Sequence, residues 1–173
     1  MRKYLLAFII LLLSVAPGKS QSDHSKSITI SPLLLILPVL ETTLEFKLEE
    51  RSGVAGVFGI GSVWGVGVFE AGAQYNYYIA GDFRHGLQLG GEALYTHFSL
   101  ADGSTTGKEN GNIISVGPYI GYKYAANFGL TLNAQAGATT GFGSIILTGG
   151  PNNTAMKVTA SGLLLNLNLG WSF

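Results

Sequence analysis

The sequence predicts an all-β fold, an eight-stranded antiparallel up-and-down transmembrane β-barrel, preceded by a cleaved signal peptide. Three observations lead to this prediction. Apolar residues recur at every second position through most of the chain, which is the period of a β-strand. Glycine contributes 25 of the 173 residues, about twice its usual share of roughly 7%. Charged residues make up only 12% of the chain, against roughly 25% in a soluble domain.

The composition also excludes several classes of protein. Hydrophobic residues make up 47% of the chain, too many for a disordered protein. The formal net charge is zero, so no basic excess is present to bind nucleic acid. The chain has no cysteine and three scattered histidines, so we expect no disulfide, no metal site and no cofactor.

Residues 1–20 are expected to form the signal peptide. Arg2 and Lys3 precede an apolar run over residues 4–15, and small residues follow at Ala16, Gly18 and Ser20. This is the layout of a secretory signal. The run is too short for a membrane-spanning helix, which needs about 20 residues. A flexible lead, 21–26, and a barrel domain, 27–173, follow.

Eight strands of about ten residues account for the rest of the chain, a length typical of membrane barrels. Six of them alternate cleanly, at residues 43–48, 69–77, 87–96, 115–124, 130–138 and 163–173. Two more, near 27–36 and 54–63, are less regular. Pro118 falls in the middle of a strand, which predicts a bulge or a locally missing ladder bond.

Alternation alone leaves open which face points outward, because a soluble lipocalin-like barrel also alternates. The polar face is mostly Gly, Ser, Thr, Asn and Gln, with few charges. Such residues suit a narrow, packed interior better than a surface in water. The apolar face of the clean strands carries no charge, as contact with lipid requires, since a charge there costs about 2–4 kcal/mol. The membrane barrel is therefore favoured.

The expected connections are also those of a bacterial outer-membrane barrel, in which periplasmic turns are short and outer loops longer. Short turns are predicted at 49–53, 80–86 and 125–128, and the longest loops at 99–111 and 141–160. Loop 141–160 has an apolar centre. It could cover the barrel mouth, extend the strands, or present an exposed strand edge to which a partner binds. Aromatic residues near the strand ends predict two membrane-interface girdles, formed by Trp64, Phe69, Tyr77, Tyr95, Tyr122, Tyr124, Trp171 and Phe173.

The final strand, LNLNLGWSF, resembles the C-terminal assembly signal of outer-membrane β-barrels, with Leu169, Trp171 and the terminal Phe173 at alternating positions. The segment GPYIGYKY is similar to a strand common in small outer-membrane barrels. The stretch SITISPLLLILPVLETTLEFKL, followed by YNYYIAGDFRHGLQLGGEALY, resembles a porin-like family of small barrels whose function is unassigned. The resemblance implies a location in the outer membrane of a Gram-negative cell. It also implies outer-membrane lipid and the barrel-assembly machinery as partners.

An eight-stranded barrel has an interior that side chains can fill. Five charged residues are predicted to line it: Glu45, Lys47, Glu70, Glu92 and Lys123. Unpaired charges are costly in a low dielectric, so we expect them to pair into a plug. A narrow small-solute channel is the alternative. The favoured function is therefore a non-catalytic structural or surface-interaction protein that binds an extracellular ligand or protein through loops 99–111 and 141–160.

An enzymatic alternative rests on His97 and Ser99, with Glu109 following in the predicted loop. A histidine can activate a serine hydroxyl when the two are within hydrogen-bonding distance. The pair resembles the His-x-Ser pair of outer-membrane lipid A deacylases. No further motif of that family surrounds it, so these three residues are weak catalytic candidates.

Overall fold

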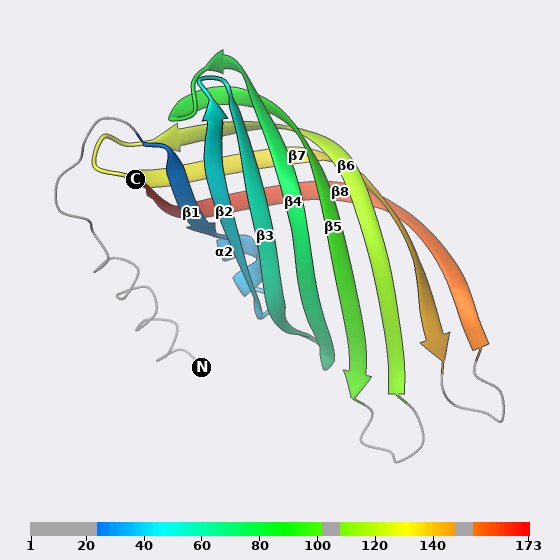
Figure 1. Ribbon diagram of the computed structural model, residues 1–173. Coiled ribbons are helices and arrows are strands. Elements are labelled where there is room, and N and C mark those ends of the chain that lie inside the picture. The colour runs from blue at the N-terminus through cyan, green and yellow to red at the C-terminus, as the bar shows by residue number, and fades with distance from the viewer. Residues whose placement is uncertain (1–23, 102–107, 148–153) are drawn as a thin grey trace, which may run out of the picture.

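The computed structural model describes residues 24–101, 108–147 and 154–173, which form eight strands and one short helix (Figure 1). The bounds are β1 Lys26–Ile30, α2 Pro32–Leu35, β2 Val39–Glu49, β3 Ser52–Val63, β4 Val66–Gly81, β5 His85–Ala101, β6 Lys108–Ala125, β7 Leu130–Leu147 and β8 Thr154–Ser172. The expected signal peptide, residues 1–20, lies outside the described residues, as do positions 21–23 of the expected lead.

The strands form a closed antiparallel barrel in sequence order, as predicted. Seven of the eight ladders join sequence neighbours, and the eighth joins β1 to β8. One end of the barrel, here called the short-turn end, carries the turns at 50–51, 82–84 and 126–129 and the last residue, Phe173. The opposite end, the rim, carries α2, the turn at 64–65 and the tips of β5 to β8 (Figure 1).

The barrel is polar inside and apolar outside. On β8, Leu163, Leu165 and Leu167 are exposed while Asn168 and Ser172 are buried. The same phase holds on the other strands, where the buried polar side chains include Thr43, Glu45, Gln74, Asn76, Gln88, Thr96, Lys123, Thr131, Asn133 and Gln135. This is the reverse of a soluble barrel, which directs its apolar face inward.

The first strand is shorter than predicted: β1 ends at Ile30, and residues 32–35 form α2 instead of continuing the expected strand to 36. Lys26 and Phe173 exchange both backbone hydrogen bonds, at 2.9 Å each. Hydrogen-bonded positions alternate along an antiparallel strand, so the next β1 positions facing β8 are Ile28, Ile30 and then Pro32. Proline has no N–H to donate, and it suits the first turn of a helix. The β1–β8 ladder therefore ends at Ile30 and Leu169.

The two predicted long loops are largely strand, so their boundaries were wrong. In the segment 99–111, Ser99 pairs with Asn110 and the ladder continues to Ala101 and Lys108. In the segment 141–160, the ladder runs from Gly141 and Ala160 up to Leu147 and Thr154. The apolar centre of 141–160 extends a hairpin, which was one of its three expected roles. Residues 102–107 and 148–153 lie outside the described residues.

Pro118 interrupts the β6–β7 ladder as predicted. Val116 pairs with Thr140 and Tyr119 with Gly137, whereas Gly117 and Pro118 have no ladder partner on β7. The register is the same on both sides of the gap, so ladder bonds are missing and no residue is inserted. The Thr139 hydroxyl donates to the carbonyl of Val116 at 3.3 Å, which satisfies one acceptor beside the gap.

No helix among the described residues is long and apolar enough to span a membrane.

Candidate functional site: the polar lumen

The centre of the candidate site is a buried ion pair between β2 and β6. Lys123 Nζ lies 2.6 Å from Oε2 of Glu45, and both side chains are almost completely buried. The remaining lone pairs of the carboxylate are also used: Asn76 Nδ2 and the Tyr78 hydroxyl donate to Oε1 at 2.8 and 2.9 Å. Ser27 donates to Oε2 at 3.4 Å. A buried pair needs such additional hydrogen bonds to offset its desolvation.

An aromatic side chain from a turn covers this pair. Phe83 belongs to the turn at 82–84, yet it is 1% exposed because it folds back into the barrel. Lys123 Nζ lies 3.6 Å from the centre of the Phe83 ring, a distance at which the ring face attracts a cation. Phe83 also meets the Tyr78 ring edge to face, with centroids 6.0 Å apart. The short-turn end of the lumen is therefore closed by packed side chains.

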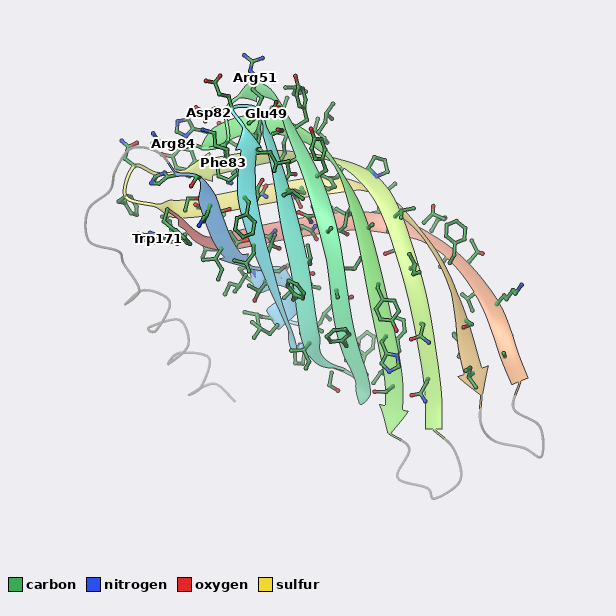
Figure 2. All side chains as sticks on the ribbon, viewed as in Figure 1. Glu49, Arg51, Asp82, Phe83, Arg84 and Trp171 are labelled. Carbon is green, nitrogen blue, oxygen red and sulfur yellow. The ribbon has the colours of Figure 1, made fainter. Side chains whose placement is uncertain are left out.

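The turn that presents Phe83 is held by its own backbone. Asp82 Oδ1 accepts hydrogen bonds from the N–H groups of Arg84, at 2.8 Å, and His85, at 3.1 Å. Arg84 Nη2 reaches the next turn and donates to Asn127 Oδ1 at 2.6 Å. Slight burial raises the pKa of Asp82, but the two backbone N–H groups together with the nearby charges of His85 and Arg84 leave that pKa below its usual range. Figure 2 shows Asp82, Phe83 and Arg84 together at the short-turn end.

Tyr119 closes the next layer of the lumen. Its hydroxyl donates to Asn76 Oδ1 at 2.6 Å, which links β6 to β4 across the barrel. Its ring lies over Gly90, where an added Cβ would stand 2.4 Å from the ring carbons. Only glycine fits at this position, so the glycine makes room for the aromatic ring that fills the lumen.

Amide side chains and a second carboxylate fill the middle of the lumen. Glu92 Oε2 accepts from Gln74 Nε2 at 2.6 Å and from Asn166 Nδ2 at 3.4 Å. Asn166 Nδ2 also donates to Gln135 Oε1 at 3.0 Å. In another group, Gln88 Nε2 donates to Asn133 Oδ1 at 2.8 Å. These hydrogen bonds cross the barrel and fix the strands relative to one another.

The structure separates the five predicted lumen charges into groups. Glu45 and Lys123 pair, whereas Glu70 and Glu92 lie nearer the rim, with Glu70 Oε1 accepting from Thr96 at 3.3 Å. Lys47 pairs in register with Gly53 near the short-turn end, so it does not join the carboxylates of the rim half. The five charges therefore do not form the single predicted cluster, because Glu70 and Glu92 lie apart from the buried pair of Glu45 and Lys123. No three acidic or histidine residues among those described could together hold a metal ion.

Several residues of the site were not predicted. Glu41 is buried in the lumen, 5% exposed, in phase with Thr43 and Glu45. Extending the alternation of β2 by two residues would have found it. The packing of Tyr78 and Tyr119 against the pair depends on contacts across the barrel. No sequence signal indicates the inward turn of Phe83.

Two of the weak catalytic candidates, His97 and Ser99, lie on the outer face of β5 toward the rim, and the third, Glu109, lies on β6. His97 Nδ1 lies 2.8 Å from Asn112 Oδ1 on β6, and the Tyr95 hydroxyl donates to the same oxygen at 2.7 Å. The Ser99 hydroxyl instead lies over Gly67 on β4. The two side chains thus turn toward different neighbouring strands. Glu109 pairs in register with Leu100, not with His97 or Ser99.

The predicted interface aromatics lie on the outer face or in turns. Seven of them are substantially exposed, namely Trp64, Phe69, Tyr77, Tyr95, Tyr122, Tyr124 and Phe173, while Trp171 is half-buried and packs on Phe128. Figure 2 places Trp171 at the short-turn end. Leu169, Trp171 and Phe173 alternate along the outer face of the last strand, and Phe173 bonds the backbone of Lys26.

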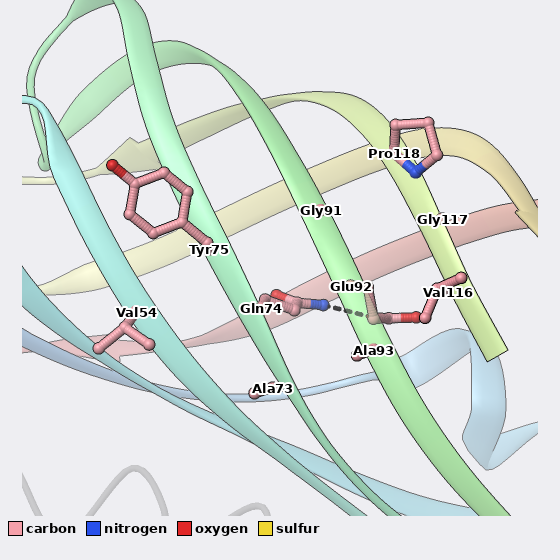
Figure 3. A pocket seen from close by; sticks show the side chains of 10 residues that line it. All are labelled: Val54, Ala73, Gln74, Tyr75, Gly91, Glu92, Ala93, Val116, Gly117 and Pro118. Atoms are coloured by element: carbon pink, nitrogen blue, oxygen red, sulfur yellow. Dashed lines mark hydrogen bonds between the residues drawn. The ribbon is translucent and has the colours of Figure 1, made fainter. Parts of the chain in front are cut away.

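A shallow apolar groove of about 570 Å³ crosses the outer face of β3 to β6. Tyr75 and Pro118 lie on either side of Gly91 (Figure 3). Because Gly91 has no side chain, its backbone forms the floor of the groove. The hydrogen bond between Gln74 and Glu92 lies beneath it, on the lumen side. The groove has no charged side chain on its outward surface, and it suits contact with hydrocarbon.

No protein-family model matches this chain, and comparisons with curated proteins and with solved structures found no significant similarity.

Proposed function

We propose that this protein is an outer-membrane β-barrel with a non-catalytic structural or surface-interaction role. The observation that carries the proposal is the inverted polarity of the barrel, with its buried polar lumen and exposed apolar outer face. The buried ion pair beneath Phe83 and the hydrogen-bonded side chains beyond it also support a filled, non-conducting lumen.

The distribution of charge on the outer face supports a bilayer around the barrel. Lys26 on β1 is an outward charge at the short-turn end, and Lys157 on β8 is one near the rim. At the heights between them, the outward positions of the described strands carry no Asp, Glu, Lys or Arg. A lipid-facing charge costs about 2–4 kcal/mol at the bilayer midplane and little near the interfaces. The exposed aromatics near the strand ends fit the two interfacial girdles of such barrels.

The surface-interaction role is proposed for the hairpin tips of β5–β6 and β7–β8, within 99–111 and 141–160. Their ladders continue to Ala101 and Lys108 and to Leu147 and Thr154, so both hairpins are long and paired. By contrast, β3 and β4 are joined by a two-residue turn at 64–65. A ligand or protein outside the cell would therefore meet one side of the rim first.

A lipid-modifying enzyme is the second candidate, and one observation favours it. Asn112 Oδ1 accepts from Nδ1 of His97, which leaves Nε2 as the basic nitrogen of a neutral ring. A general base needs this tautomer. The position of Ser99 over Gly67 counts against it, because a nucleophile must lie within reach of its base. An enzyme predicts that Ser99→Ala alters the mass profile of lipid A, whereas the non-catalytic role predicts no change.

Gel mobility of separated membrane fractions, boiled and unboiled, tests the main proposal. A closed outer-membrane barrel stays folded in detergent and migrates anomalously until it is heated. We expect the protein in the outer fraction, with a mobility shift on boiling. A soluble periplasmic protein with no shift would overturn the proposal. Bilayer conductance of the wild type would instead favour the narrow channel.

A further inference from the structure

The β1–β8 junction leaves most of one strand edge uncovered. β1 pairs with β8 only at the four positions from Leu169 to Ser172. β8 itself continues to Thr154, and its ladder with β7 is unbroken along that length. Among the described residues, the stretch of β8 from residue 155 to residue 167 therefore has a strand on one side only.

Two hydrogen-bonded pairs show which β8 residues direct their backbone N–H and C=O groups toward this edge. Phe173 bonds Lys26 on β1, whereas the N–H of Ser172 donates to Gly129 on the β7 side. With no register shift along β8, even-numbered residues face β7 and odd-numbered residues face the free edge. Seven residues present both their N–H and C=O groups there: Ala155, Lys157, Thr159, Ser161, Leu163, Leu165 and Leu167.

Within the described part of the chain, β1 ends before it covers this edge. Pro32 stands where β1 would next donate to Leu167, and it has no N–H. Helix α2 contacts both β2 and β8 next to this point. A four-residue helix cannot supply the row of donors and acceptors that seven β8 residues require.

We infer that the free edge of β8, residues 155–167, is a docking site for one antiparallel strand of a partner protein. The donors and acceptors repeat about every 7 Å, two residues of strand, and an extended polypeptide matches that repeat while a lipid does not. All described ladders of the barrel are antiparallel, so the added strand would continue the same pattern.

The side chains of the edge specify the chemistry of the partner. Leu163, Leu165 and Leu167 are exposed on the outer face, so the lower half of the edge fits apolar side chains. Lys157 is the one charged residue of β8, and it is exposed. A carboxylate opposite Lys157 would form a favourable cross-strand pair. The partner strand is therefore apolar at its amino end and acidic at its carboxyl end.

A second copy of this chain does not fit the edge. Two barrels inserted in the same direction bring their β8 strands together in parallel, not antiparallel. Barrel strands tilt about 35–45° from the membrane normal, so the two copies would cross and could not form a long ladder.

A synthetic 13-residue peptide tests the inference on the purified full barrel in detergent micelles. The peptide alternates valine and threonine, carries charged solubilising ends, and has a glutamate opposite Lys157, near its carboxyl end. The control peptide has the same composition with that glutamate near its amino end. Residue-resolved amide exchange by NMR should slow at the odd residues of 155–167 and not at the even residues, which are already bonded to β7. The slowing should be greater with the first peptide than with the control at the same concentration.

Three variants separate strand pairing at this edge from non-specific adsorption of the peptide. Leu165→Pro removes an edge N–H without touching the β7 ladder and should weaken peptide binding on the order of tenfold. Leu165→Ala keeps the N–H and removes only the exposed side chain, so the loss of affinity in Leu165→Pro beyond that in Leu165→Ala measures the edge hydrogen bond. Lys157→Glu should abolish the preference for the first peptide. Odd-residue amides already protected in the purified protein, or equal protection by both peptides, would overturn the inference. The test runs in micelles, so its result does not depend on the proposed cellular location.

Discussion

The ammonium group of Lys123 lies 3.6 Å from the centre of the Phe83 ring, although Lys123 belongs to a strand and Phe83 to a turn. The ring covers an ion pair that is itself bonded to three further side chains. The charge pair and its apolar cover therefore form one unit, and four of the predictions below concern it or its supports.

Removing one member of the Glu45–Lys123 pair should destabilise the barrel more than removing both. Glu45→Gln or Lys123→Met alone leaves a buried charge without its partner, at a cost of about 3–5 kcal/mol. The double variant removes both charges and should recover more than half of that loss. Urea unfolding in detergent gives the free energies. Additive effects of the two changes would contradict the coupling.

Phe83→Ala should open the short-turn end of the lumen. Loss of the buried ring costs about 3–5 kcal/mol, and water should then reach Lys123. We expect a lower urea midpoint for this variant but no ion conductance in planar bilayers, because Tyr119 and the amide side chains still fill the rest of the lumen. Phe128→Ala changes a phenylalanine that is 62% exposed in another turn of the same end, and it should leave both stability and conductance unchanged.

Gly90→Ala and Gly91→Ala should differ sharply, although the glycines are adjacent. A Cβ on Gly90 would stand 2.4 Å from the Tyr119 ring, whereas on Gly91 the nearest atom would be 4.0 Å away. Overpacking of this kind costs about 1–3 kcal/mol. The first variant should unfold at lower urea concentration, and the second should match the wild type. Equal midpoints would show that Tyr119 moves freely.

Protonation of Asp82 should loosen the turn that holds Phe83. The folded-state pKa of Asp82 lies below the ordinary value of 3.8, so its stabilising effect is complete above that value. It is lost as the pH falls through the lowered pKa. Asp82→Asn keeps an acceptor for Arg84 and His85 but does not titrate, so the unfolding midpoint of this variant should vary less between about pH 5 and pH 2. Asp82→Ala should be less stable throughout that range.

Local periodicity was enough to predict the strand number and the antiparallel barrel, because alternation directly reflects a two-sided sheet. The direction of each face also needed the composition, since the polar face carries few charges. It was not enough for the first strand, where the apolar run after Ser31 suits either strand or helix. There, the position of Pro32 relative to β8 decided the outcome.

The lumen was predicted by residue type but not by arrangement. Glu45 and Lys123 lie on the predicted face, yet their pairing depends on the register of strands far apart in sequence. Phe83 was missed because a turn residue enters the lumen only when the opposing strands leave space for it. Glu41 was missed for a simpler reason, namely that β2 begins before the expected alternation.

The four-residue contact between β1 and β8 also has a consequence for how the chain folds. Every other ladder joins neighbours in sequence and can form as a hairpin. The β1–β8 contact joins the two ends of the described chain and must wait until the intervening strands are in place. Closure of the ring is therefore the late, slow step of folding. An N-terminal truncation through Ile30 would produce a sheet of seven strands that forms its hairpins at normal speed and never closes.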